Sequence, residues 1–239
     1  MLRNANALVA SHVLLAVGAG DLRRTMLYVV CLILAITVHE FSHALAAHKL
    51  GDPTPEGQGR LTLNPVAHAD PIGTLVLPVT LGLFSPGMLF GWGRPVMTQP
   101  RLFTRKVTMR GGMALVAFAG PLSNLLMAAA VLVVVWVAGL AGGGPAWMYD
   151  PEQPLWLFFQ LNLVLFAFNL LPIHPLDGGK VLGWLLGARY QHVDDFLTRY
   201  GGFILLALVL GAPRVLSYVL GPIVQLGAWA WVHAAGAGL

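Results

Sequence analysis

Charged residues are scarce in this chain. Asp, Glu, Lys and Arg make up 10% of its 239 residues, hydrophobic residues make up 57%, and the mean hydropathy is +0.73. A soluble domain carries about 25% charged residues, so this chain cannot cover a water-exposed surface with polar groups. The composition predicts an all-α polytopic membrane protein. Its length allows about six spans of roughly 20 residues each, in a single membrane-embedded domain over residues 1–239.

Cysteine is almost missing as well. The chain has one, Cys31, inside an apolar stretch, which excludes an internal disulfide and a zinc cluster built from cysteines. The net charge is only +4, and in a membrane protein such charge lies in loops and sets the orientation. We therefore expect membrane lipid around the chain and no nucleic-acid partner.

Apolar stretches bounded by charge, Gly or Pro predict the membrane helices. The clear ones are 26–50, 112–140, 155–176, 201–218 and 222–237, and a shorter first span is expected at about 6–20. The stretch 72–92 is also apolar, but Pro78, Gly82, Pro86 and Gly87 interrupt it. It is either a span or a re-entrant loop that enters and leaves the membrane on one side.

The connecting segments differ sharply in positive charge. Residues 141–154 contain no Lys or Arg, whereas residues 49–111 contain seven and residues 177–200 contain three. Positive loops stay in the cytoplasm, so we expect 49–111 and 177–200 on the cytoplasmic side of the cell membrane and 141–154 outside. Arg23 and Arg24 then fall on the external side, as an exception to the rule.

One polar motif stands at the end of an apolar run. His39, Glu40 and His43 form the pattern H-E-x-x-H, whose i, i+4 spacing puts both imidazoles on one face of a helix. Two such imidazoles are a common zinc-binding arrangement. Glu40 projects beside the metal, where a carboxylate can take a proton from the attacking water and return it to the leaving amine. Ionisable residues in a membrane helix are costly and usually mark function.

Zinc in a catalytic site takes a third protein ligand and keeps one position open. Ala46 and Lys49 stand where a metzincin would have Gly and His, which excludes that class. His48 lies about 140° further round the helix than His43 and is expected to face away. Loop residues such as His68 and Asp70 also serve as turn and capping groups. The candidates outside the motif are His48, His68, Asp70, His174 and Asp177.

Three stretches together resemble the site-2 protease family of intramembrane zinc metalloproteases. They are "HEFSH" at 39–43, "AGPLSN" at 119–124 and "NLLPIHPLDGG" at 169–179, in the family's order. The segments "GDPTPEGQGRLTLNPVAHADPIGT" at 51–74 and "FGWGRPV" at 90–96 resemble the bacterial branch that lacks a PDZ or other large soluble domain.

The resemblance implies the chemistry of the site. It makes Asp177 the third ligand of one zinc ion per chain, with Glu40 as the catalytic residue and about 26–180 as the catalytic core. It implies cleavage of the transmembrane segments of single-pass membrane proteins, either regulatory proteins or signal-peptide remnants.

The metal hypothesis constrains the topology. Zinc–ligand bonds are about 2 Å long, so the helices carrying His39 and Asp177 must bring these residues to one depth, near the cytoplasmic side. Both helices must then run in the same direction. This favours a re-entrant 72–92, because 112–140 already provides one crossing between them.

Further residues are expected around the site. Asn124 and Asn169 would hydrogen-bond the substrate backbone or the oxyanion, with helix–helix contact as the alternative. His174 would lie behind the metal ligands. A short β segment or hairpin at 59–66 and 74–79 would hold the unwound substrate extended.

Two other functions fit an H-E-x-x-H helix in a membrane. A membrane metal transporter would carry a relay of metal sites on other spans, and no such relay is apparent in the sequence. An inactive scaffold that binds transmembrane helices would be expected to lack Glu40 or a ligand, and all of them are present.

Overall fold

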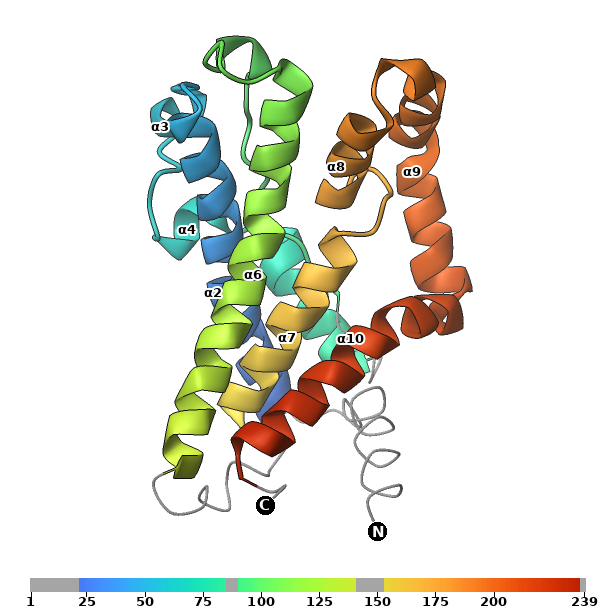
Figure 1. Cartoon of the computed structure of the whole chain (residues 1–239). Helices are drawn as coiled ribbons and strands as arrows, with labels where there is room; N and C mark the ends of the chain where they lie inside the picture. The colour runs from blue at the N-terminus through green and yellow to red at the C-terminus, as the bar shows by residue number, and fades with distance from the viewer. Residues whose placement is uncertain (1–21, 85–89, 141–152, 237–239) are drawn as a thin grey trace.

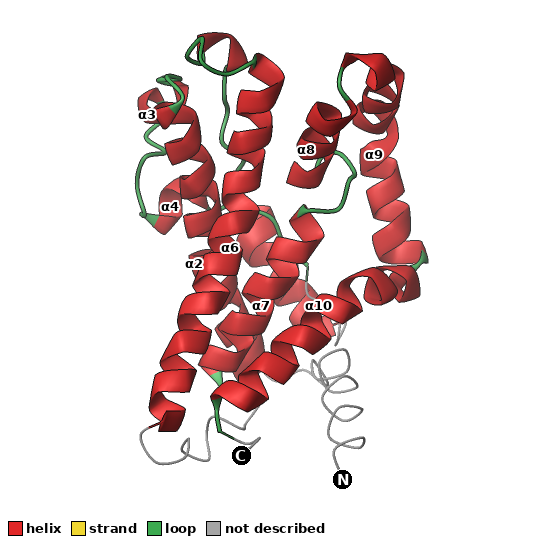
Figure 2. Cartoon of the chain, in the orientation of Figure 1, coloured by secondary structure: helices red, strands yellow, loops and turns green. Residues whose placement is uncertain are grey.

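The computed structural model describes residues 22–84, 90–140 and 153–236, and over these ranges it is built from helices without a strand (Figure 2). Ala69 and Gly93 form an isolated antiparallel β-bridge. The all-α expectation is therefore confirmed, while the span expected at 6–20 lies outside the described residues.

Three helices are long and apolar enough to cross a membrane. They are α2 (Leu22–Lys49), α6 (Met109–Leu140) and α10 (Pro213–Ala234). A shorter apolar helix, α7 (Pro154–Asn169), lies beside them. In Figure 1, α2 and α7 run in one direction and α6 runs in the opposite one, while α6 packs against α2, α7 and α10. The parallel arrangement of α2 and α7 is the one that the metal hypothesis requires.

The segment between α2 and α6 folds into short helices and one stretch without helix. It contains α3 (Thr54–Gly57), α4 (Pro65–His68), the π-helix η1 (Pro71–Val76), α5 (Leu77–Phe84) and the 3-10 helix η2 (Pro100–Leu102). Residues 90–99 form no helix, and this 90–99 segment lies alongside 68–74. Trp92 N–H donates to the carbonyl of Gly73, and Arg94 N–H donates to that of His68.

The strands expected at 59–66 and 74–79 are wrong. Asn64 accepts a hydrogen bond from Val66 N–H, and Asp70 accepts from Ile72 and Gly73 N–H. Each of these caps is followed by a proline at the first helical position, a strong helix-start signal. The caps and prolines outweigh the alternating β-branched pattern, so helices begin at Pro65 and Pro71, and residues 59–63 form turns and bends.

The C-terminal spans also differ from the expected boundaries. The chain continues from α7 into α8 (Asp177–Leu186), the 3-10 helix η4 (Ala188–Tyr190), α9 (Gln191–Gly211) and α10. Pro172 and Pro175 follow the early end of α7, where residues preceding proline disfavour helix. Pro213 begins α10 after a break at Ala212, which divides the span expected at 201–218.

An aromatic core joins α7 and α10 at the end of the bundle away from the H-E-x-x-H motif. Trp156 and Trp231 meet edge to face with ring centroids 4.9 Å apart, and Phe159 lies 5.3 Å from Trp231. Val135 of α6 is fully buried in the same cluster. In a membrane this packing supplies much of the helix–helix attraction.

Replacing Trp231 by Ala should therefore destabilise the bundle, by about 3 kcal/mol, because it opens a cavity between α7 and α10. The measurement is the thermal unfolding midpoint of the detergent-solubilised protein. Trp229→Ala is the matched control, since Trp229 on the same helix is 55% exposed and Trp231 is 3% exposed. Equal midpoints for the two variants would contradict this account of the core.

Candidate metal centre and active site

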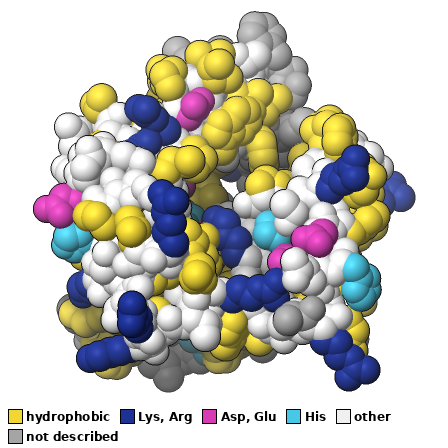
Figure 3. Space-filling view, turned by 90° about the horizontal axis from the view of Figure 1, so that it is seen from above, with side chains coloured by type: hydrophobic (Ala, Val, Ile, Leu, Met, Phe, Trp, Pro, Cys, Tyr) yellow, Lys and Arg dark blue, Asp and Glu magenta, His cyan; other side chains and the backbone are white. Residues whose placement is uncertain are grey.

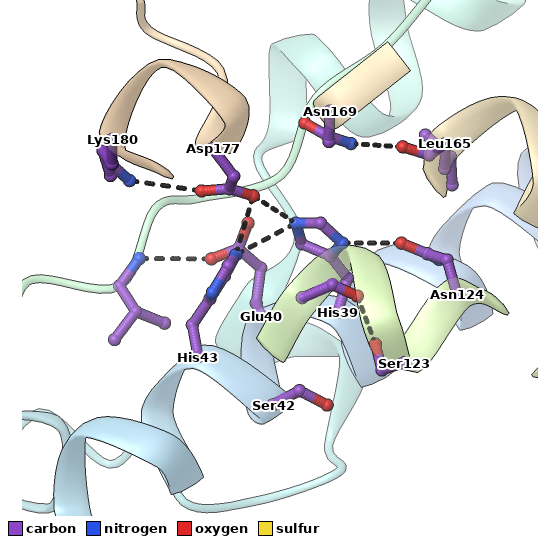
Figure 4. A network of polar contacts seen from close by, with 12 residues as sticks. His39, Glu40, Ser42, His43, Ser123, Asn124, Leu165, Asn169, Asp177 and Lys180 are labelled. Carbon is purple, nitrogen blue, oxygen red and sulfur yellow. Dashed lines mark hydrogen bonds and ion pairs between the residues drawn. The ribbon is translucent and has the colours of Figure 1, made fainter. Parts of the chain in front are cut away.

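The two histidines of the motif converge on one point inside the bundle. Both side chains are buried on the same face of α2, and their Nε2 atoms lie 3.0 Å apart. This follows from the helical spacing, since i and i+4 are neighbours one turn apart. Figure 4 shows the two rings directed toward the first turn of α8.

Asp177 comes to the same point from α8, 134 residues after His43 in the sequence. Its Oδ2 lies 3.2 Å from Nε2 of His39 and 3.1 Å from Nε2 of His43. His39, His43 and Asp177 form a group that could hold a metal ion, as the sequence predicts.

The other candidate ligands are engaged elsewhere. His48 is exposed and lies 3.5 Å from Glu56, and His68 contacts the carbonyl of Thr62. Asp70 caps η1. His174 lies 3.1 Å from Asp194 of α9, so its ring is engaged with α9.

Backbone and amide groups fix the tautomers of both histidines. Nδ1 of His43 lies 2.7 Å from the carbonyl of Val116, and Nδ1 of His39 lies 2.6 Å from Oδ1 of Asn124. The orientation of Asn124 is itself fixed, because its Nδ2 donates to Asn162 Oδ1 while Asn162 Nδ2 donates to the carbonyl of Phe158. Each Nδ1 must therefore carry the proton, which leaves both Nε2 atoms as bare acceptors.

This donor set fits a zinc ion. Two acceptor nitrogens and a carboxylate oxygen, 3.0 to 3.2 Å apart, repel one another unless a cation lies between them. A tetrahedral zinc ion with bonds of about 2.0–2.1 Å holds its ligands about 3.3 Å apart, so the observed triangle needs little adjustment.

Gly120 of α6 forms a wall of the same space. A Cβ built on Gly120 would clash with Nε2 of His43 and lie 2.7 Å from Cε1 of His39. Any side chain here would enter the space between the ligands. The "AGPLSN" stretch therefore serves the site twice, through the missing side chain of Gly120 and through the amide of Asn124.

Asp177 is held in its charged form. Burial alone would raise the pKa of this carboxyl, but the neighbouring His43 and His39 hold the pKa well below its usual range. Lys180 Nζ lies 3.2 Å from its Oδ1, on the side away from the histidines (Figure 4). Cβ atoms on Gly178 or Gly179 would clash with, or crowd, residues 170–174, so the two glycines let the loop fold tightly against α8.

Glu40 lies at the edge of the metal-ligand group. Its Oε2 accepts a hydrogen bond from Val96 N–H of the 90–99 segment at 3.2 Å. Glu40 and the three candidate ligands line a cavity of about 380 Å³, together with parts of the 90–99 segment and the end of α7. This arrangement places a carboxylate beside a potential metal and next to space for a substrate.

The two asparagines named from the sequence are placed differently. Asn169 lines the cavity, and its Nδ2 donates to the carbonyl of Leu165. Asn124 is fully buried, and both ends of its amide are occupied by His39 and Asn162. The structure therefore bonds Asn124 to a metal ligand and to α7, and does not place it among the residues that line the cavity.

Sequence reasoning missed Asn162, Lys180 and Gly120. A polar Asn162 inside an apolar helix is a detectable signal, because such a group needs a partner. Lys180 lies one turn after Asp177, at a spacing that favours an ion pair. No sequence signal shows that Gly120 faces the histidines.

Comparisons with known proteins agree with the site. Residues 137–210 match the family model described as Peptidase family M50. The chain is 39% identical over 202 residues to YwhC of Bacillus subtilis, named as a candidate zinc metalloprotease, covering 83% of this chain and 86% of YwhC. No solved structure matches the chain.

Mycobacterial proteins are more distant relatives, again named as candidate zinc metalloproteases. Rip2 of Mycolicibacterium smegmatis is 30% identical over 216 residues, which cover 85% of this chain and 77% of Rip2. Rip3 of Mycobacterium tuberculosis is 28% identical over 204 residues, which cover 84% of this chain and 41% of Rip3.

Gly120→Ala should strongly reduce metal content, because the added methyl group enters the space between His39 and His43. The measurement is zinc per chain in purified protein, by mass spectrometry. Gly202→Ala is the matched control, since Gly202 is also helical and a Cβ there meets nothing within 4 Å. Full zinc content in Gly120→Ala would show that the metal lies elsewhere.

Asn162→Ala should weaken zinc binding about 10–100-fold, the usual cost of losing a group that orients a ligand. The variant frees Asn124 to rotate, so Nδ1 of His39 loses its fixed acceptor. Competition with a zinc chelator measures the affinity. Asn124→Ala and the double variant should show similar affinities, because both residues act through one chain of bonds; additive losses would refute that chain.

Proposed function

The chain belongs to peptidase family M50, the site-2 protease family, and is a zinc metalloprotease of the membrane; from this we propose that it hydrolyses peptide bonds in the transmembrane segments of single-pass membrane proteins. The observation that carries the proposal is the buried group of His39, His43 and Asp177 with Glu40 on the same cavity. Two of these ligands lie on α2, a helix long and apolar enough to cross the membrane. The products would be regulatory fragments or cleared signal-peptide remnants.

The zinc would be held by His39, His43 and Asp177, one ion per chain. When bound, zinc supplies Lewis acidity, which polarises the scissile carbonyl and makes water a stronger nucleophile. Lys180 would keep Asp177 oriented through its Oδ1. Asn124 would hold His39 in the tautomer that presents Nε2.

Glu40 is the proposed general base and acid. Its carboxylate takes a proton from the attacking water while the water oxygen bonds to the carbonyl carbon. It then gives that proton to the amide nitrogen as the carbon–nitrogen bond breaks. A carboxylate that lines the cavity beside the ligands can reach both positions.

Asn169 is the proposed contact for the substrate backbone or the developing oxyanion. Its side chain lines the cavity, and one N–H is used by Leu165. An amide has a second N–H and a carbonyl oxygen, which can bond a peptide in the cavity. His174, paired with Asp194, would keep the loop before Asp177 against α9.

A substrate helix must unwind before its carbonyls can react. The 90–99 segment forms no helix, and it lines the cavity together with Phe168 and Asn169 of α7. We place the unwound substrate between these walls. Photocrosslinking probes at 90–96 that never capture a substrate would count against this placement.

The proposed topology has about six spans in the cell membrane, with 72–92 re-entrant and the site nearer the cytoplasm. The path supports this, since residues 90–94 return alongside 68–74. The face seen from above is hollowed near its middle, and Lys and Arg side chains gather around the hollow (Figure 3). Positive charge favours the cytoplasmic side, where water for hydrolysis is available.

The two alternative functions fit the structure less well. A transporter needs a relay of metal sites, and the described part of the chain contains one group of three metal-binding side chains. An inactive scaffold has no use for Glu40 on the cavity beside those ligands.

Glu40→Gln should abolish cleavage, by about 10²–10⁴-fold, while zinc content stays at the wild-type level. The amide keeps the shape of the side chain but cannot accept the proton from water. Zinc per chain and cleavage of an internally quenched single-span peptide are measured on the same preparation. Glu56→Gln, an exposed glutamate in α3, is the control.

Membrane proteomes of wild-type and Glu40→Gln cells would identify the substrates, as single-span fragments that accumulate in the variant. Wild-type cleavage by the Glu40→Gln protein would rule out the proposed mechanism.

A further inference from the structure

Arg60 is a buried cation without an acidic partner. It is 5% exposed, and the part of the chain that the structure describes offers it no ion pair. Its Nη1 donates instead to two backbone carbonyls, those of Ala67 and Arg94, the latter at 3.2 Å. Burying a charge is expensive unless its bonds serve the structure, so the question is what these two bonds achieve.

The two carbonyls belong to different parts of the chain. Ala67 lies in α4, and Arg94 lies in the 90–99 segment. Arg60 therefore clamps the segment to α4, beside the bond from Arg94 N–H to the carbonyl of His68 and the bridge between Ala69 and Gly93. Both bonds come from Nη1, whose two N–H groups lie in the fixed plane of the guanidinium, whereas the ammonium of a lysine has no fixed donor directions.

The clamped segment lies directly on α2 at Glu40. A Cβ built on Gly93 would clash with Ile36 and lie 3.5 Å from Cγ of Glu40. Three residues later, Val96 N–H donates to Oε2 of Glu40. The position of the segment thus determines where this hydrogen bond holds the carboxylate.

The far end of the segment has a separate anchor. Asp52 is fully buried, and it accepts hydrogen bonds from Gln99 N–H and Thr54 N–H. Arg60 and Asp52 hold the two ends of the stretch that contains Val96. Burial and the neighbouring Arg94 lower the pKa of Arg60, and Glu40 opposes this shift.

We propose that Arg60 is a positioning residue that clamps the 90–99 segment and thereby holds the Glu40 carboxylate in place, through Val96 N–H, for proton transfer. This inference rests on the proposed role of Glu40. Arg60 does not touch the metal ligands, so its loss should affect the rate of reaction and leave the metal bound.

The test uses the full-length purified enzyme and an internally quenched single-span peptide that the wild type cleaves. Arg60→Met should lower kcat about 10–100-fold, the cost of a small displacement of a reacting group, and KM should rise by a smaller factor, because the clamped segment also forms a wall of the proposed substrate site. Zinc per chain and the visible spectrum of the Co²⁺-substituted enzyme should match the wild type. Arg60→Lys should recover only part of kcat, and Arg105→Gln, which removes an exposed charge, should behave as wild type.

A second variant tests the route to Glu40. Val96→Pro removes the N–H that Glu40 accepts, so its kcat should fall to a similar level. The Arg60→Met/Val96→Pro double variant should lose no more than the worse single variant, because both act on one contact.

Three results would overturn the inference: wild-type kcat in Arg60→Met, loss of zinc in Arg60→Met, or multiplied losses in the double variant. Failure of the proposed function is distinguishable, because Glu40→Gln would then cleave normally. If Glu40→Gln is inactive and Arg60→Met is fully active, the proposed role of Arg60 is wrong and the proposed function still holds.

Discussion

A buried hydrogen bond joins Nδ1 of His39 to the amide of Asn124, and the metal centre depends on it. The bond puts the proton on Nδ1 and leaves Nε2 free as a ligand. Its direction is fixed by Asn162, whose own amide is anchored to the backbone carbonyl of Phe158. One chain of bonds thus links α7, α6 and α2, and it decides the tautomer of a metal ligand.

That chain needs close helix packing, and small residues provide it. Ala44 and Ala47 of α2 and Ala117 of α6 are almost fully buried, which lets the two backbones approach. Gly120 allows α6 to pass directly over the histidines. In a membrane, where lipid is as apolar as the helices, such packing and the buried amide bonds replace much of the hydrophobic force that folds soluble proteins.

Local features of the sequence predicted local structure well. Spacing alone put His39 and His43 on one face of a helix, and apolar length located α2 and α6 within a few residues. Asp177 required the family resemblance, because nothing in its own neighbourhood shows that α8 meets α2. The strands expected at 59–66 and 74–79 failed because the Asn64 and Asp70 caps outweighed alternation.

The remaining misses depend on tertiary structure. The partners of Asn162 and the contact of Gly120 exist only once α2, α6 and α7 are assembled, so periodicity within one helix cannot show them. The division of 201–218 at Pro213 was readable in principle, since proline at the first helical position starts a new helix. The sequence stays apolar across Ala212, so hydropathy alone does not show where α9 ends and α10 begins.

Gly120 has a consequence for motion as well as for space. Because bare backbone of α6 closes one side of the ligand group, the size of that site is set by the distance between two helices and not by a rotatable side chain. A sideways shift of α6 would move the two imidazoles that contact it, because no flexible side chain lies between them and the α6 backbone at Gly120. The contact between α2 and α6 is therefore part of the ligand geometry, as much as the side chains that carry the ligand atoms.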